Sequence, residues 1–126
     1  MLYLDASAFV SALGGEVHSE PMRRVMMEHP TVSSALLEIE VARLTAGYGE
    51  DVRRLARERL QAVRLVDIDR AVIAKASQIA PEVRLRSLDA IHLATALLLP
   101  EPVSMITLDQ RLKAASMMVG VDVSAN

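Results

Sequence analysis

The sequence predicts an α/β fold, a three-layer sandwich in which a central parallel sheet of four to five strands is flanked by helices. Short extended segments alternate with helical ones along the whole chain. The extended segments are continuous apolar runs, as in strands buried on both faces, and such strands are typical of parallel sheets. With 126 residues, of which 52% are hydrophobic, we expect a single domain over residues 1–126 with one core.

The first predicted strand covers residues 2–4 and stops at Asp5. Small and apolar residues at 6–13 then predict a helix, which two glycines follow. A second helix is predicted over 18–28 from methionine and valine at helical spacing. After Pro30 we expect a brief strand at 31–33.

The next segment predicts two helices and a strand. Ser34 is a candidate N-cap for a helix over 35–46, and a second helix is expected over 51–62. Residues 63–66 then read as a strand. The predicted buried stripe of the first of these helices consists of Leu36, Leu37, Glu40, Val41 and Leu44.

The last third of the chain continues the alternation. Asp67 or Asp69 is expected to cap a helix over 70–79, and a charged loop follows at 82–86. Ser87 is a candidate cap for a helix over 88–98. The remaining elements are predicted as a buried strand at 103–107, a helix capped by Asp109 that runs to about 116, and an edge strand at 119–123.

Composition excludes several classes of protein. The chain has no Cys, which rules out disulfides and thiolate-bound zinc, and the His residues at 18, 29 and 92 have no zinc spacing. Any metal must therefore bind mainly oxygen ligands. The N-terminus does not resemble a secretory signal, and no apolar run is long enough to span a bilayer. We expect a cytoplasmic protein that does not enter the membrane.

The charge pattern is that of a weakly acidic protein with local basic clusters. The net charge is −2, and 12 of the 14 basic residues are Arg. Arg53, Arg54, Arg57 and Arg59 crowd one segment, where a solvated helix face is favoured over a phosphate-binding site. With three aromatic residues, a platform for stacking bases is not expected.

Four acidic residues are the candidate site. Asp5 and Asp109 follow predicted strands, Asp89 falls in the first turn of a helix, and Glu40 lies within an apolar stripe. In open parallel sheets, sites form at the carboxyl ends of the strands. Each acid also has a structural alternative: Asp5 and Asp109 as caps, Asp89 as an acid favoured by the helix dipole, and Glu40 as a partner of Arg43.

Clustered carboxylates repel one another, which is unfavourable unless a cation neutralises them. Carboxylate ligands suit Mg²⁺ or Mn²⁺, and these ions also bind phosphate oxygens. If the four acids meet, we therefore expect a metal centre that acts on phosphodiesters. His92 is three residues from Asp89, but a packed, hydrogen-bonded His is favoured there over a metal ligand.

Four segments resemble the PIN-domain family and, within it, the VapC-type toxins. They are YLDASAF at 3–9, SSALLEIEVAR at 33–43, LRSLDAIHLATAL at 85–97 and TLDQRL at 107–112. The resemblance implies that Asp5, Glu40, Asp89 and Asp109 hold Mg²⁺, or Mn²⁺, and form the catalytic set. It makes Ser7 and Thr107 candidate polar helpers. Ala6 departs from the hydroxyl residue that many relatives carry after the first Asp.

The same resemblance implies the function. It points to a metal-dependent endoribonuclease that cleaves RNA by metal-activated water, and to the toxin of a type II toxin-antitoxin pair. Its expected partners are an RNA substrate, a VapB-like antitoxin and a second copy in a homodimer or a toxin-antitoxin hetero-oligomer. Arg43 and Arg86 are candidates for steering phosphate. A non-catalytic binding module and a DNA nuclease of the same fold remain as alternatives.

Overall fold

The computed structural model describes residues 1–13 and 19–126 and has a parallel sheet at its centre. Its strands are β1 (Leu2–Leu4), β2 (Thr31–Ser34), β3 (Arg64–Val66) and β4 (Ser104–Ile106). They pair in the order β3-β2-β1-β4, and all three pairings are parallel. The predicted α/β sandwich with a parallel sheet is therefore confirmed.

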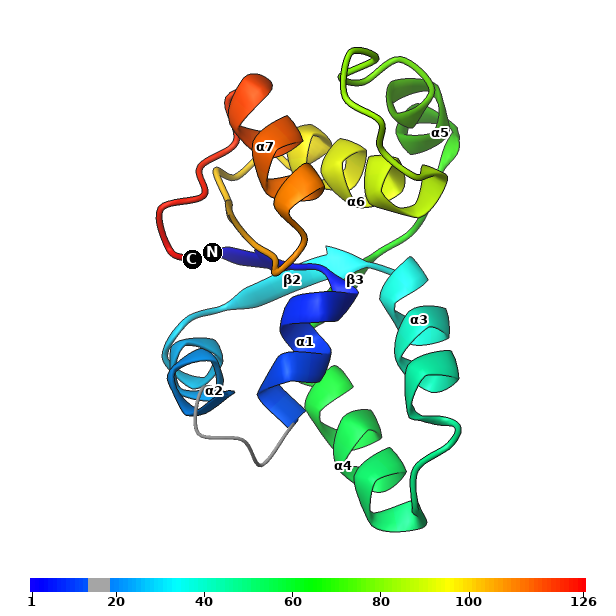
Figure 1. The fold of residues 1–126 in the computed structure, drawn as a ribbon, viewed down its shortest axis with the longest axis vertical. Coiled ribbons are helices and arrows are strands. Elements are labelled where there is room, and N and C mark those ends of the chain that lie inside the picture. Colours follow the sequence, from blue (N-terminus) through cyan, green and yellow to red (C-terminus); the bar gives the residue numbers. More distant parts are fainter. Residues whose placement is uncertain (14–18) are drawn as a thin grey trace.

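Helices cover both faces of this sheet (Figure 1). One layer holds α1 (Ala6–Leu13), α2 (Ser19–Glu28), α3 (Leu36–Thr45) and α4 (Glu50–Leu60). The other layer holds α5 (Arg70–Ala76), α6 (Ser87–Leu98) and α7 (Gln110–Met118). Within the described ranges, no helix is long and apolar enough to cross a membrane.

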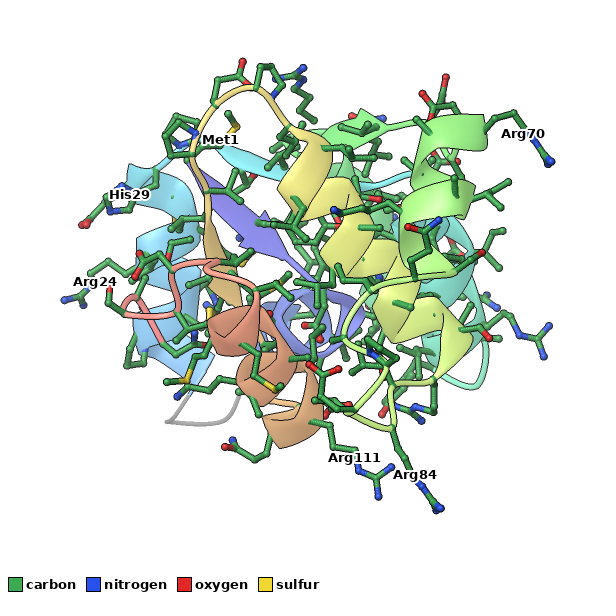
Figure 2. All side chains as sticks on the ribbon, turned by 90° about the horizontal axis from the view of Figure 1, so that it is seen from above. Met1, Arg24, His29, Arg70, Arg84 and Arg111 are labelled. Carbon is green, nitrogen blue, oxygen red and sulfur yellow. The ribbon has the colours of Figure 1, made fainter. Side chains whose placement is uncertain are left out.

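Two hydrophobic clusters hold the layers together, one on each face of the sheet. Successive strand side chains point to opposite faces. In β1, Leu2 and Leu4 pack with Phe9 of α1 on one side, while Tyr3 packs with Leu93 of α6 on the other. Long charged side chains such as Arg24, Arg70 and Arg111 point outward from the ribbon (Figure 2). Strands β1 and β2 are thus buried on both faces, as expected from the sequence, whereas the edge strand β3 is partly exposed.

Several local predictions need correction. Leu44 is 53% exposed, so the buried stripe of α3 is narrower than predicted. Ala35, and not Ser34, occupies the N-cap position of α3, although the Ser34 hydroxyl still accepts from the Leu36 amide at 3.1 Å. Ser87 is the first residue of α6 and caps nothing; Arg86 stands at the N-cap and makes no capping bond from its side chain.

Other elements end at different residues than predicted. The predicted edge strand at 119–123 reduces to one isolated bridge between Ser104 and Asp122. Helix α5 ends at Ala76 and not near 79, and the chain turns through Ala80 at a φ of +43° before Pro81. The glycines expected to follow the first helix, and the predicted start of the second at residue 18, lie outside the described residues.

The strand order places a site at one edge of the sheet. From β1 the chain moves outward through β2 and β3, and it then returns across the sheet to β4 on the other side of β1. A crevice forms where such connections diverge, beyond the carboxyl ends of the two adjacent strands. Here those ends belong to β1 and β4. Asp5 and Thr107 directly follow them.

Candidate active site

A pocket of about 630 Å³ opens at this edge, and all four predicted acids line it. Asp5 comes from the end of β1, Glu40 from α3, Asp89 from the first turn of α6, and Asp109 from the loop between β4 and α7. Two predicted arginines, Arg43 and Arg86, also line it. The pocket thus gathers residues more than a hundred positions apart in the chain.

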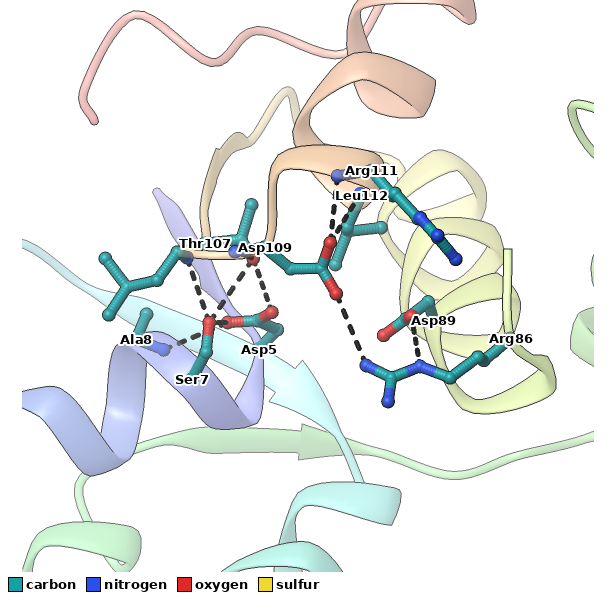
Figure 3. A network of polar contacts seen from close by, with 10 residues as sticks. Asp5, Ser7, Ala8, Arg86, Asp89, Thr107, Asp109, Arg111 and Leu112 are labelled. Carbon is teal, nitrogen blue, oxygen red and sulfur yellow. Dashed lines mark hydrogen bonds and ion pairs between the residues drawn. The ribbon is translucent and has the colours of Figure 1, made fainter. Parts of the chain in front are cut away.

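Asp5 is buried, with 4% exposure, and is held by several donors (Figure 3). Its Oδ1 accepts from the Ser7 hydroxyl at 2.7 Å and from the Ala8 amide at 3.0 Å. Its Oδ2 accepts from the Thr107 hydroxyl at 2.5 Å. Ser7 and Thr107 therefore orient Asp5. Oδ1 accepts two hydrogen bonds, whereas Oδ2 accepts one and keeps a lone pair for a further ligand.

Thr107 is itself fixed by a residue that the sequence analysis did not identify. The Thr107 amide donates to the side-chain oxygen of Asn126 at 2.9 Å, and the Asn126 amide donates to the Met105 carbonyl at 2.7 Å. The Asn126 side chain thereby bonds backbone groups at the end of β4, as a neighbouring strand would do. No local pattern marks this contact, because its partners are about twenty residues away.

Asp109 is both a helix cap and a pocket residue. Its Oδ1 accepts from the amides of Arg111 at 2.8 Å and Leu112 at 3.3 Å, which caps α7 as predicted. Its Oδ2 faces Arg86 at 3.3 Å. The capping interpretation and the site interpretation are therefore compatible, because each uses a different oxygen.

Arg86 bridges two of the acids. Its guanidinium lies 3.3 Å from both Asp89 and Asp109, and its side chain is 76% exposed (Figure 3). Burial raises the pKa of Asp89 above its ordinary value, the charges of Asp109 and Asp5 add to the rise, and Arg86 opposes it. The acids are thus close enough to repel one another, and Arg86 supplies the compensating positive charge.

Glu40 is held by His92 and not by Arg43. The Nε2 atom of His92 lies 2.6 Å from Oε1 of Glu40, and its Nδ1 atom lies 2.8 Å from the Tyr3 hydroxyl. None of the ion pairs among the described residues joins Glu40 to Arg43. The prediction of a packed, hydrogen-bonded His92 agrees with this geometry, but the sequence analysis missed its link to Glu40.

The oxygen atoms that line the pocket are suitable ligands for a hard divalent cation. The pocket offers carboxylate and hydroxyl oxygens, partly shielded from water, of the kind that Mg²⁺ and Mn²⁺ prefer. Among the residues that the structure describes, no three Asp, Glu or His side chains lie close enough together to hold one ion. Binding by the full set therefore requires the exposed Arg86 side chain to leave the acids and the carboxylates to draw together.

The arginine cluster of α4 lies outside this pocket. Arg53 and Arg57 pair with Glu50, and Arg54 pairs with Asp51, all along the exposed side of the helix. This agrees with the solvated-face interpretation. Arg53, Arg54 and Arg57 are thus paired with acidic side chains of their own helix.

The parallel sandwich and an acidic pocket beyond β1 and β4 define the class of protein, and comparison with known families agrees. The model of the PIN domain matches residues 2–116, so the chain belongs to the PIN-domain family. Two curated relatives from Mycobacterium tuberculosis are ribonucleases of the VapC group. Ribonuclease VapC46 is 39% identical over 98% of this chain and 96% of its own, and Ribonuclease VapC35 is 35% identical over 92% and 90%.

Solved structures share the fold. A toxin-antitoxin complex from Klebsiella pneumoniae contains a chain that aligns with a TM-score of 0.78, at 18% identity, over 100% of this chain and 98% of that one. The M. tuberculosis toxin VapC20, described as cleaving the sarcin-ricin loop, aligns with a TM-score of 0.72, at 17% identity, over 91% and 95%. At these identities the likeness concerns the fold alone.

Proposed function

We propose that this chain is a Mg²⁺- or Mn²⁺-dependent endoribonuclease that acts in the cytoplasm as the toxin of a type II toxin-antitoxin pair. The observation that carries the proposal is the convergence of four carboxylates from four elements on one pocket, at the switch point of a parallel sheet. Membership of the PIN-domain family and the ribonuclease names of its relatives support it.

In this proposal Asp5, Glu40, Asp89 and Asp109 hold the divalent cation. When bound, the cation supplies an activated water as nucleophile and neutralises charge on the phosphate oxygens. Ser7 and Thr107 keep Asp5 turned into the pocket.

Arg86 and Arg43 are the candidates for binding the phosphate backbone. Arg86 releases the acids and contacts phosphate with its rigid, fork-shaped guanidinium. Arg84 and Arg111, which project into solvent, offer further contacts outside the pocket (Figure 2). Because few arginines take part, recognition of the backbone is local.

Cleavage of labelled total RNA by the antitoxin-free protein tests the proposal. We expect cutting with Mg²⁺ or Mn²⁺, none with EDTA, and none by the Asp5→Asn, Asp89→Asn double variant. The products should carry 5′-phosphate and 3′-hydroxyl ends, because water attacks the phosphorus. Products with 2′,3′-cyclic phosphate would require attack by the 2′-hydroxyl of the RNA and would contradict this mechanism.

The same assay separates the alternatives. If the protein is a general or DNA-directed nuclease, single-stranded DNA will compete with RNA and will be cut at a similar rate. A folded wild-type protein that cuts neither substrate in either metal would move the assignment to a non-catalytic binding module. Either result would overturn the endoribonuclease proposal.

The antitoxin is expected to cover the pocket and the surface of the early helices. Leu44 of α3 and Leu88 of α6 line the pocket and are 53% and 47% exposed, which offers an apolar rim to a partner. Asp89 and Asp109 bind the Arg86 guanidinium, so a basic side chain of the antitoxin is expected to take this position when the exposed Arg86 side chain leaves it. An antitoxin that bound without reducing cleavage would contradict this arrangement.

Dimerisation of the toxin is a separate part of the proposal. Light scattering coupled to gel filtration measures the mass of the free toxin and of its complex. A homodimer or a toxin-antitoxin hetero-oligomer is expected, and a monomer under both conditions would exclude it.

A further inference from the structure

A chain of hydrogen bonds crosses from the core to the pocket. It begins at the Tyr3 hydroxyl in β1, passes through the imidazole of His92 in α6, and ends at Glu40 in α3. Tyr3 is fully buried and His92 is 1% exposed, whereas Glu40 lines the pocket. This series of hydrogen bonds therefore connects a buried part of the core to one carboxylate of the candidate metal set.

The direction of the bond to Glu40 follows from the chemistry of the groups. An ionised carboxylate can only accept, so Nε2 of His92 carries a proton and donates to Oε1 of Glu40. The Tyr3 hydroxyl forms the hydrogen bond with Nδ1 on the other side of the ring. Both ring nitrogens of His92 are thus hydrogen-bonded.

This arrangement uses one oxygen of Glu40 and leaves the other. In the described part of the chain, no protein donor bonds Oε2 of Glu40. The ring of His92 is locked by the edge-to-face contact with Tyr3, whose ring centroid is 5.8 Å away. Glu40 is therefore held by a buried partner, with its second oxygen available to a ligand in the pocket.

We infer that His92, supported by Tyr3, is a positioning residue that holds Glu40 in the orientation needed to bind the divalent cation. This inference rests on the proposed function. Partners that orient a metal ligand typically change metal affinity or activity by about 10- to 100-fold when they are removed. A role in core packing alone predicts instead a change in stability with no specific effect on the metal.

Two amide substitutions separate the contact that Nε2 of His92 makes from the contact that Nδ1 makes. In His92→Gln, the amide nitrogen reaches the position of Nε2 and keeps a donor for Glu40. In His92→Asn, the amide remains near Nδ1 and the bond to Glu40 is lost. Both variants place a neutral amide in the same buried position, so they serve as controls for each other. A further control is Ser116→Ala, which removes a buried hydroxyl from α7, outside the pocket.

Calorimetric titration with Mn²⁺ alone is the primary measurement, followed by single-substrate kinetics. We expect His92→Asn to weaken Mn²⁺ binding by about 10-fold or more and to lower kcat with KM for RNA unchanged. His92→Gln should stay within about threefold of the wild type, since it keeps the contact to Glu40. Ser116→Ala should lower the melting temperature but leave Mn²⁺ affinity as it is.

A double-variant cycle tests the route through Glu40. In a Glu40→Gln background, His92→Asn should cause no additional loss of Mn²⁺ affinity, because the group that it orients is gone. Equal Mn²⁺ binding by the wild type and His92→Asn would overturn this inference while the proposed function stood. A wild-type protein that bound no Mn²⁺ and cut no RNA would overturn both.

Discussion

At the scale of single residues, the candidate site is built from carboxylates that are each held by one to three hydrogen bonds. Asp5 takes bonds from both Ser7 and Thr107, and Thr107 also accepts from the Asp109 amide at 3.0 Å. One hydroxyl thus links two of the acids. Losing it leaves a buried acceptor and a donor without partners, which is costly in a part of the structure with little access to water.

Replacing Thr107 with Val tests this link. We expect the free energy of unfolding to fall by about 1–3 kcal/mol, and RNA cleavage to fall by about 10- to 100-fold. Chemical denaturation and initial rates measure the two effects. Thr45→Val is the matched control, because the Thr45 hydroxyl is buried but bonds within α3 to the Val41 carbonyl. A Thr107→Val protein as active as the wild type would show that Asp5 needs no such orientation.

At the scale of elements, helix α7 is capped by a residue of the candidate active site. Asp109 caps it through Oδ1 and faces Arg86 through Oδ2, so one side chain combines capping with a place in the pocket. We predict that Asp109→Ala costs about 1 kcal/mol of stability. Asp109→Asn should fold as stably as the wild type, because Asn is an equally good cap, yet it should lose cleavage as Asp109→Ala does. Thermal melts and cleavage rates of the pair separate the two roles.

Helix α4 gives a prediction for pH. Hydrogen bonds from Arg57 and Arg53 lower the pKa of Glu50 below its ordinary value of 4.5. The ionised form is thus favoured in the folded state, so its contribution is present above that value and is lost as pH falls through the lowered pKa. We expect Glu50→Gln to destabilise the protein slightly at neutral pH and not at strongly acidic pH.

Melting temperatures across a pH series measure this difference. Glu58→Gln is the control, since Glu58 lies on α4 and makes no ion pair in the described residues. An effect of Glu50→Gln that persisted unchanged at strongly acidic pH would show that charge is not its cause. The effect should be small, because Glu50 and both arginines are exposed.

At the scale of the whole molecule, we predict that metal binding in the acidic pocket is coupled to stability. Carboxylates that repel one another in the absence of metal are neutralised when a cation binds to the folded state alone. At a metal concentration of 100 times Kd this adds about 2.7 kcal/mol of stability. We predict a higher melting temperature in Mg²⁺ or Mn²⁺ than in EDTA, and no such increase for the Asp5→Asn, Asp89→Asn variant.

Calorimetry with and without metal checks this prediction. An equal gain on adding metal in both proteins would mean that the ion binds elsewhere.

The sequence alone determined the features that depend on local patterns. Apolar runs and helical spacing predicted the alternation of strands and helices, because side-chain periodicity follows directly from backbone geometry. The placement of Asp5 and Asp109 just after strands was enough to predict that they lie at one edge, since parallel strands share their carboxyl ends. The cap of α7 was likewise predicted from the preference of Asp for that position.

The tertiary structure decided the choice of partners. The sequence did not indicate that Arg86 bridges Asp89 and Asp109, or that Leu44 faces outward. It also left Glu40 with Arg43 as its nearest candidate partner, whereas the fold brings His92 to it from another layer. Periodicity reports which face of an element is buried. It carries no information about which distant element packs there, and that depends on the order of strands in the sheet.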